Sequence, residues 1–223
     1  MSIDSGPMRE PDTPDAWPLS LFAALAAIWL LLALAPSYRA DWLLENALVF
    51  AALPALWWGY GRLRFSRLAY AGLFVFLALH LLGAHYTYSE VPYDAWSRQW
   101  LGVSIDAALG FERNHYDRLV HFVFGLALAP LAHEWVNLRV GATRAWRHVI
   151  AVSFLLSVAA IYELLEWCAA LVFGGELGMA YLGAQGDVWD GHKDTALALG
   201  GALLASFAIG LGRPALAARS MGR

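Results

Sequence analysis

The chain has 223 residues, 60% of them hydrophobic and only 15% charged, with a formal net charge of −3. Soluble domains carry about 25% charged residues, so this composition indicates an integral membrane protein. No basic tract suits nucleic acid as a partner, and the single cysteine, Cys168, excludes an internal disulfide or a thiolate metal site.

Six predominantly apolar segments follow one another along the chain, and each approaches the roughly 20 residues that a membrane-spanning helix needs. They cover about residues 19–35, 42–60, 68–83, 117–137, 148–173 and 194–212. We therefore predict an all-α integral membrane protein, a bundle of about six transmembrane helices in one domain over residues 18–213. Residues 1–17 are predicted to form a disordered cytoplasmic tail, and residues 214–223 a second cytoplasmic tail.

The connection between the third and fourth segments is the longest one. Between Tyr93 and Leu109 it places Trp96, Trp100 and Ile105 among polar residues. That pattern is typical of a helix that lies in the membrane interface.

Basic residues are distributed unevenly among the connections and tails. Ten of the 15 Lys and Arg residues lie in the connections after the second and fourth segments or in the terminal tails, and five lie in the other connections. Because basic residues stay on the cytoplasmic side of a membrane, we predict that both termini are cytoplasmic.

Under this orientation, histidines and carboxylates gather on the outer, periplasmic side. They are His80 and His85 at the end of the third segment, Asp117 and His121 at the start of the fourth, Glu163 and Glu166 in the fifth, and Asp187, Asp190 and Asp194 around the start of the sixth. Charged residues within a membrane helix are costly and usually face a polar, functional interior. We therefore expect these side chains to converge in one cavity.

Carboxylates together with imidazoles are ligands for divalent ions such as Zn²⁺, Mn²⁺ or Mg²⁺. The expected metal ligands are His80, His85, Asp117, His121, Glu163, Asp190 and Asp194. The expected catalytic carboxylates are Glu163, Glu166 and Asp187. No catalytic motif of fixed spacing is present to define a substrate.

Each of these residues also has a purely structural interpretation. Arg113 and Arg118 offer ion-pair partners to Asp117 or to the glutamates, although both arginines are expected to extend to water at the interface. Lys193 is expected to point away from the helix face that carries the three aspartates. The pair His133-Glu134, near the other end of the fourth segment, is expected to be interfacial.

Three functions are compatible with this pattern. The first is a divalent-metal-dependent membrane enzyme, a hydrolase or transferase, that acts on a lipid or lipid-linked substrate at the outer leaflet. The second is a small ion- or proton-coupled transporter, in which the glutamates bind cations. The third is a non-catalytic assembly or structural protein. Polar residues in both halves of the membrane would favour the transporter, and the inner half of this sequence carries only Glu134 as an acid.

Four motifs in order resemble the YjdF-like family of bacterial inner-membrane proteins. They are residues 83–88 (GAHYTY), 113–122 (RNHYDRLVHF), 162–167 (YELLEW) and 186–190 (GDVWD). The resemblance extends over about residues 20–210. It implies a polytopic protein of the bacterial inner membrane with about six helices, and it brings no established activity, substrate or catalytic residue.

Overall fold

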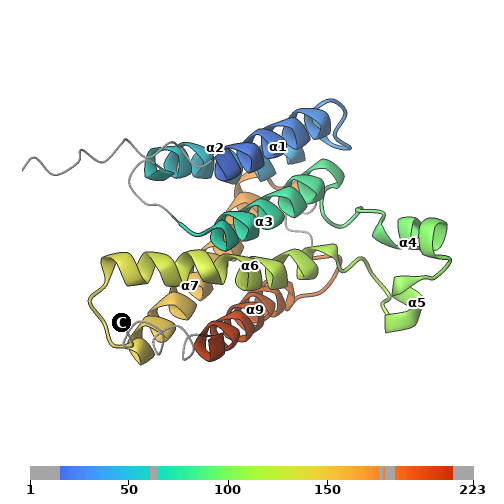
Figure 1. The fold of residues 1–223 in the computed structure, drawn as a ribbon. Helices are drawn as coiled ribbons and strands as arrows, with labels where there is room; N and C mark the ends of the chain where they lie inside the picture. The colour runs from blue at the N-terminus through green and yellow to red at the C-terminus, as the bar shows by residue number, and fades with distance from the viewer. Residues whose placement is uncertain (1–15, 61–64, 176–177, 179–183, 213–223) are drawn as a thin grey trace, which may run out of the picture.

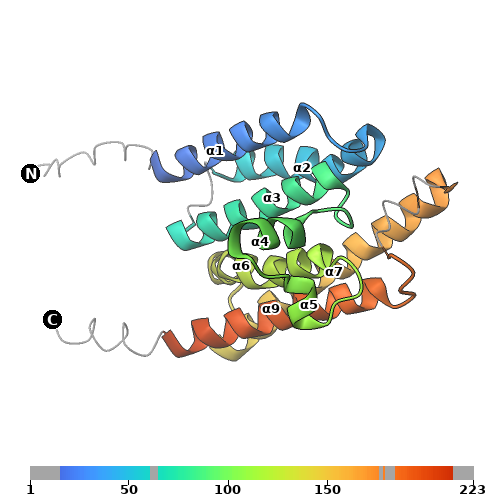
Figure 2. The same ribbon diagram turned by 90° about the vertical axis from the view of Figure 1, so that its right-hand side faces the viewer.

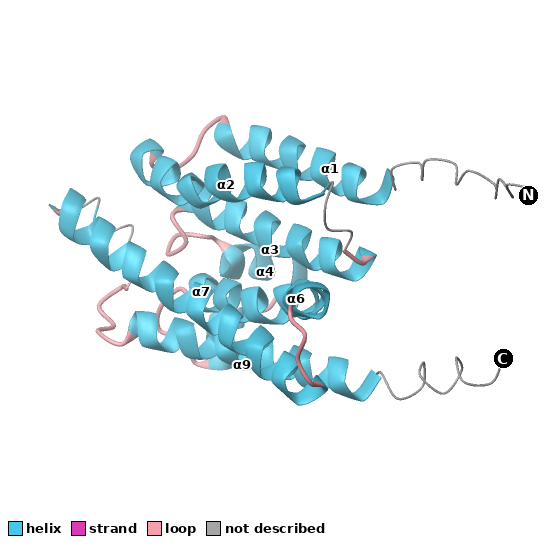
Figure 3. Ribbon diagram, turned by 90° about the vertical axis from the view of Figure 1, so that its left-hand side faces the viewer, coloured by secondary structure: helices cyan, strands magenta, loops and turns pink. Residues whose placement is uncertain are grey.

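The computed structural model describes residues 16–60, 65–175, 178 and 184–212. Within these ranges no strand occurs, and the elements are helices joined by loops and turns (Figure 3). In chain order the helices are α1 (Ala16–Ala33), α2 (Arg39–Tyr60), α3 (Arg67–Tyr86), α4 (Tyr93–Leu101), α5 (Ile105–Leu109), α6 (Tyr116–Arg139), α7 (Arg144–Phe173) and α9 (Asp190–Gly212). The predicted all-α fold is confirmed. Apart from residues 16 and 17, the two predicted tails lie outside the described residues.

Five of the described helices are long and apolar enough to cross a membrane: α1, α3, α6, α7 and α9. Large apolar side chains on these helices, such as Leu31 and Leu171, face outward with 68% and 66% exposure. Because soluble proteins rarely leave wide apolar surfaces in water, lipid is the natural cover. Helix α2 has the length but carries Arg39 and Glu45 in its first half, and it is not among the five.

Helix α6 lies at the centre of the bundle and packs against α3, α7 and α9, whereas α1 and α2 pack against α3 (Figure 1). Figure 2 shows that α1 begins and α9 ends at the same end of the bundle. Helices α6 and α9 start next to each other at the opposite end. Their first turns therefore meet, and this meeting point carries most of the predicted polar residues.

Small residues bring α6 close to its neighbours. A Cβ atom added to Gly125 of α6 would lie 1.9 Å from the carbonyl oxygen of Ala198, and one added to Gly201 of α9 would lie 2.1 Å from that of Phe122. The hydrophobic effect does not drive membrane helices together, because lipid is as apolar as their side chains. Close backbone packing through small residues drives their association instead. The contacts fix the register between α6 and α9.

The predicted interfacial helix is two short helices, α4 and α5. The chain breaks between them at Gly102, which has a φ of +71°, a conformation that glycine adopts without strain. Asp94 of α4 accepts hydrogen bonds from the Ser104 hydroxyl (2.9 Å) and the Asp106 N–H (3.0 Å), and it pairs with Arg98 (2.6 Å). One carboxylate thus holds the two helices together.

The α4–α5 unit is fastened to the start of α6. The Tyr93 hydroxyl donates to Asp106 (2.6 Å) and accepts the N–H of His115 (3.1 Å), next to the first residue of α6. Trp100 and Leu101 remain 76% and 72% exposed on its surface. In Figure 1 the unit projects beyond the ends of α3 and α6. An exposed apolar surface beyond the ends of these helices is suited to contact with the membrane interface.

The other end of the bundle also carries buried polar groups. His133 is buried, and its Nε2 lies 2.6 Å from the Ser206 hydroxyl of α9. Its ring also contacts that of His148 in α7, with 4.6 Å between centroids. Glu134 accepts the N–H of Ser66, the N-cap of α3, at 2.7 Å. The packing of α6 on α9 encloses His133, so its ring faces the protein and not the lipid.

Candidate metal centre

Three helices bring carboxylates to the start of α6. Asp117 and His121 lie one turn apart on α6, and Asp190 and Asp194 lie one turn apart on α9. A spacing of four residues keeps each pair on one helix face, so the two pairs oppose each other across the α6–α9 contact. Glu163 reaches this place from α7, with its Oε1 3.3 Å from His121 Nε2.

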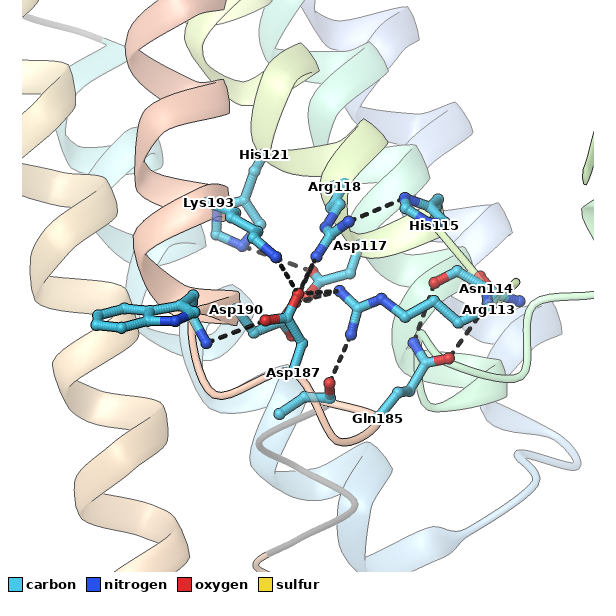
Figure 4. Close-up of polar contacts among 12 residues, drawn as sticks. Arg113, Asn114, His115, Asp117, Arg118, His121, Gln185, Asp187, Asp190 and Lys193 are labelled. Atoms are coloured by element: carbon cyan, nitrogen blue, oxygen red, sulfur yellow. Dashed lines mark hydrogen bonds and ion pairs between the residues drawn. The ribbon is translucent and has the colours of Figure 1, made fainter. Parts of the chain in front are cut away.

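The loops before α6 and α9 are clamped together. The Asn114 N–H donates to the Gln185 side chain (3.2 Å), and the Gln185 amide donates back to the Asn114 carbonyl (3.0 Å). Arg113 donates to the Ala184 carbonyl in the same loop. These bonds join segments 71 residues apart and hold the first turns of both helices in place (Figure 4).

Cations neutralise the outer part of the site. Arg118 lies 2.6 Å from Asp187 and 3.2 Å from Asp190, Arg113 contacts both aspartates, and Lys193 reaches Asp187 at 2.5 Å (Figure 4). The Lys193 ammonium, the N–H of Trp189 and the Arg118 guanidinium hold the pKa of Asp187 well below its usual range. Asp187 is therefore ionised and holds the basic side chains of this network in place. These contacts favour a positioning role over a catalytic one.

Two expectations about these cations are wrong. Lys193 does not point away from Asp187, because the loop before α9 folds this aspartate back toward it. Arg113 and Arg118 do not extend to water: their side chains are only 19% and 17% exposed. Both pair with aspartates from a segment about 70 residues further along the chain.

The inner part of the site has no such neutralisation. Within the described residues, Arg and Lys make no ion pair with Asp117, Asp194, Glu163 or Glu166. His121 Nε2 lies 3.5 Å from Asp117 and supplies the nearest basic group. Asp194 is 1% exposed, and its Oδ1 accepts no hydrogen bond in the described part of the chain.

The geometry of the inner part suits a cation. Asp117, Asp190 and Asp194 each offer an oxygen, and these three oxygens lie within 4.8 Å of one another. Two ligands that sit roughly 2.0–2.6 Å from one ion are at most about 4–5 Å apart. The three carboxylates can thus hold one divalent ion, with the His121 imidazole beside them. Oxygen ligands with one imidazole fit Mg²⁺, Mn²⁺ or Zn²⁺.

Gly191 makes room for Glu163 in this site. A Cβ atom at position 191 would lie 2.5 Å from Glu163 Oε2, so any larger residue would displace the carboxylate. Glu166, one turn along α7, is also buried, at 6% exposure. Both predicted glutamates therefore face the protein and not the lipid.

The structure places the two other predicted ligands elsewhere. The ring nitrogens of His80 contact the Tyr88 hydroxyl and the Glu45 carbonyl oxygen, the latter at 3.1 Å. His85 contacts the Leu32 carbonyl oxygen at the end of α1, at 2.7 Å. Both histidines tie α3 to neighbouring elements, so we leave them out of the ligand set.

Two residues that sequence reasoning missed extend the site. Glu45 of α2 is 3% exposed and accepts a hydrogen bond of 3.0 Å from the Tyr162 hydroxyl of α7. These residues lie 117 positions apart, so no local pattern could join them. The only signal available was that Glu45 is a carboxylate inside an apolar segment.

An apolar cavity of about 320 Å³ borders this site. Its walls come from α3, α6 and α7, and include Phe76, Leu128 and Val158. Its polar members include His121 and Tyr162, which also belong to the site or adjoin it. His121 and Tyr162 therefore connect the site to an apolar space within the helices.

Comparisons with known proteins agree with this architecture. A family model described as "Predicted membrane protein (DUF2238)" matches residues 17–213. The chain is 35% identical over 167 residues to the inner membrane protein YjdF of Escherichia coli (strain K12), covering 74% of this chain and 75% of that protein. No solved structure matches the chain. The resemblance to YjdF-like proteins is confirmed: the chain is a multi-pass inner-membrane protein and belongs to the DUF2238 family of predicted membrane proteins.

Proposed function

We propose that this chain is a divalent-metal-dependent membrane enzyme, a hydrolase or transferase that acts on a lipid or lipid-linked substrate. One observation carries the proposal: three carboxylate oxygens of Asp117, Asp190 and Asp194 lie within 4.8 Å, and Oδ1 of the buried Asp194 has no partner among the described residues. Carboxylates gathered at low dielectric stay ionised only if a countercharge is supplied. A divalent ion bound among the carboxylates would supply this countercharge within the site.

The roles follow from the contacts. Asp117, Asp190 and Asp194 are the proposed ligands, with His121 as a fourth. An ion there would polarise a phosphoryl or acyl oxygen and lower the pKa of a water molecule. Glu163, which lies 3.3 Å from His121, is the proposed acid–base group, with Glu166 behind it. Asp187 is proposed as a positioning residue that holds Arg118 and Lys193.

Six spans with both termini in the cytoplasm complete the proposal, with α2 as the additional span. The uneven distribution of basic residues supports this orientation. An even number of crossings is also supported by the position of the start of α1 and the end of α9 at the same end of the bundle (Figure 2). The metal centre then faces the periplasm.

The decisive experiment measures metal in the purified protein. We expect about one equivalent of Mn²⁺, Zn²⁺ or Mg²⁺ by elemental analysis, and an affinity for Mn²⁺ that falls at least about 10-fold in Asp194→Asn. Glu112→Gln, which removes an exposed carboxylate just before α6, is the matched control and should bind Mn²⁺ like the wild type. Release of phosphate or headgroup from a bacterial polar lipid extract should require the ion.

A protein that neither carries metal nor binds added Mn²⁺ would contradict the proposal. The transporter alternative has one observation in its favour, since buried polar side chains lie at both ends of α6: His121 at one end, and His133 with Ser206 of α9 at the other. Proton flux into liposomes that depends on Glu163 and persists with chelator would favour that alternative.

A further inference from the structure

A second apolar groove lies on the other side of α6 from the cavity described above. It measures about 720 Å³ and is bounded by α5, α6 and α9. That volume is within the roughly 300–1,000 Å³ of small-molecule and cofactor sites. The groove is open to the surroundings of the bundle, and Ile105 and Leu109 of α5 line it on the side of the α4–α5 unit.

Basic side chains line the groove near the starts of α6 and α9. Arg118 and Lys193 line it together with His115, and both cations also pair with Asp187, a carboxylate that is not among the lining residues. Lys193 is 49% exposed and Arg118 also contacts Asp190, so these side chains connect the groove to the metal centre. Guanidinium and ammonium groups are the usual protein partners of phosphate.

The wall becomes apolar away from these basic side chains. Phe122 lies six residues after the first residue of α6, and Leu197 seven after the first residue of α9. At 1.5 Å per residue both lie roughly 10 Å along their helices. Leu119, which is 49% exposed, fills the interval. Basic side chains next to an apolar wall of this length match the change from phosphate to acyl chain in one membrane leaflet.

We propose that this groove binds a phospholipid, with the phosphate between Lys193 and Arg118 and the upper acyl chain along Leu119, Phe122 and Leu197. The inference rests on the proposed function and specifies its substrate class: a lipid with a phosphate group, presented to the metal centre from the α6–α9 side. Arg118 spans the two sites, so the phosphate lies beside Asp190. Charge complementarity and continuity with the lipid-covered surface of α6 and α9 select a lipid as the occupant.

The test uses the full-length protein in detergent with a phosphatidylglycerol that carries a photoreactive diazirine on an acyl chain. Cross-linked peptides are identified by mass spectrometry. We expect labelling of residues 119–122 and 196–197 in the wild type, and a loss of at least about fivefold in Leu119→Trp and Leu197→Trp, which fill the groove. Leu204→Trp adds the same ring to an exposed position of α9 outside the groove and should label like the wild type.

A second pair of variants tests the phosphate contact. Lys193→Gln should reduce labelling by phosphatidylglycerol at least about threefold, whereas Arg139→Gln, which removes an exposed cation in the last turn of α6, should leave it unchanged. Inorganic phosphate at millimolar concentration is the competing ligand. If phosphate abolishes labelling in full, or if Leu119→Trp and Leu197→Trp label like the wild type, the groove is not a lipid site.

The Mn²⁺ affinity of the same preparations separates the two proposals. Leu119→Trp should bind Mn²⁺ like the wild type, because it touches none of the proposed ligands. Specific labelling without any metal would retain the lipid site as a binding site but contradict the enzyme. Bound metal without labelling would contradict the lipid site alone.

Discussion

At the scale of single residues, the site has two parts with different electrostatics. Asp187 and Asp190 share Arg113 and Arg118, Lys193 pairs with Asp187, and this outer network is an ion-paired structure. Asp194 and its neighbours lack such partners in the described chain. Removing one partner of a buried pair leaves an uncompensated charge, which typically costs about 3–5 kcal/mol. Substitution of Asp187 should therefore affect folding and substitution of Asp194 should affect ligand binding, whereas Asp190, which belongs to both parts, should affect both.

Gly191→Ala tests how closely Glu163 must approach α9. The added methyl group would lie 2.5 Å from Glu163 Oε2 and should push the carboxylate out of the site. We expect Mn²⁺ affinity to fall about 10-fold or more, as for residues that orient metal ligands. Isothermal titration calorimetry measures the effect.

The double variant Gly191→Ala/Glu163→Ala is the control for this prediction. With Glu163 truncated, the methyl group has no carboxylate to displace, so the double variant should bind Mn²⁺ no more weakly than Glu163→Ala alone. Additive losses would show that Gly191 acts through the backbone of α9 instead.

At the scale of elements, the α6–α9 contact positions Asp117 opposite Asp190 and Asp194. Gly201→Ala should destabilise the protein by about 1–3 kcal/mol, because its Cβ would lie 2.1 Å from the Phe122 carbonyl oxygen and the helices must separate. Thermal unfolding in detergent measures the change.

Gly200, the residue before Gly201 in α9, offers a matched control. A Cβ atom there meets nothing within 4 Å, so Gly200→Ala should be neutral or more stable by up to about 1 kcal/mol through helix propensity. Equal melting temperatures for the two variants would contradict the close contact between α6 and α9.

The α4–α5 unit should open in acid. The Asp106 N–H, the Ser104 hydroxyl and Arg98 lower the pKa of Asp94. A carboxylate with a lowered folded-state pKa contributes stability above its unfolded pKa of about 3.9, and this contribution is lost as pH falls through the folded value. We expect cleavage within residues 93–111 by pepsin to rise steeply below about pH 4.

Asp94→Asn should remove this pH dependence, because the amide cannot ionise. In this variant the α4–α5 unit should be cleaved readily even at pH 5, whereas cleavage of Glu112→Gln should depend on pH as in the wild type. Cleavage of Asp94→Asn that rises in parallel with the wild type would assign the acid sensitivity to another group.

At the scale of the whole molecule, the prediction concerns the orientation of the helices in the membrane, with both termini in the cytoplasm. Reporter fusions after Gly141 should be active in the cytoplasm, and fusions after Pro92 in the periplasm, because basic residues concentrate in the connections on the side of Gly141. A fusion on either side of α2 decides whether that helix crosses the membrane. A periplasmic signal at Gly141 would invert the orientation and place the proposed metal centre on the cytoplasmic side.

The sequence by itself determined the class of protein, the order of its long helices and the residues of the α6, α7 and α9 segments that gather polar groups. These properties depend on the length and polarity of single segments, and a four-residue spacing defines a helix face without reference to other helices. Asp117 with His121 was therefore recognisable as a pair, and Asp187, Asp190 and Asp194 were expected on one helix face, although α9 begins only at Asp190 and Asp187 lies in the loop before it.

Only the tertiary structure decided which groups meet. Arg118 reaches Asp187 across 69 positions, Tyr162 reaches Glu45 across 117, and the ring nitrogens of His80 contact Tyr88 and Glu45. Such contacts depend on which helices are neighbours, and that choice is made by close approaches such as those at Gly125 and Gly201. A helix face restricts where a side chain points, but the packing of the neighbouring helix determines what it finds there.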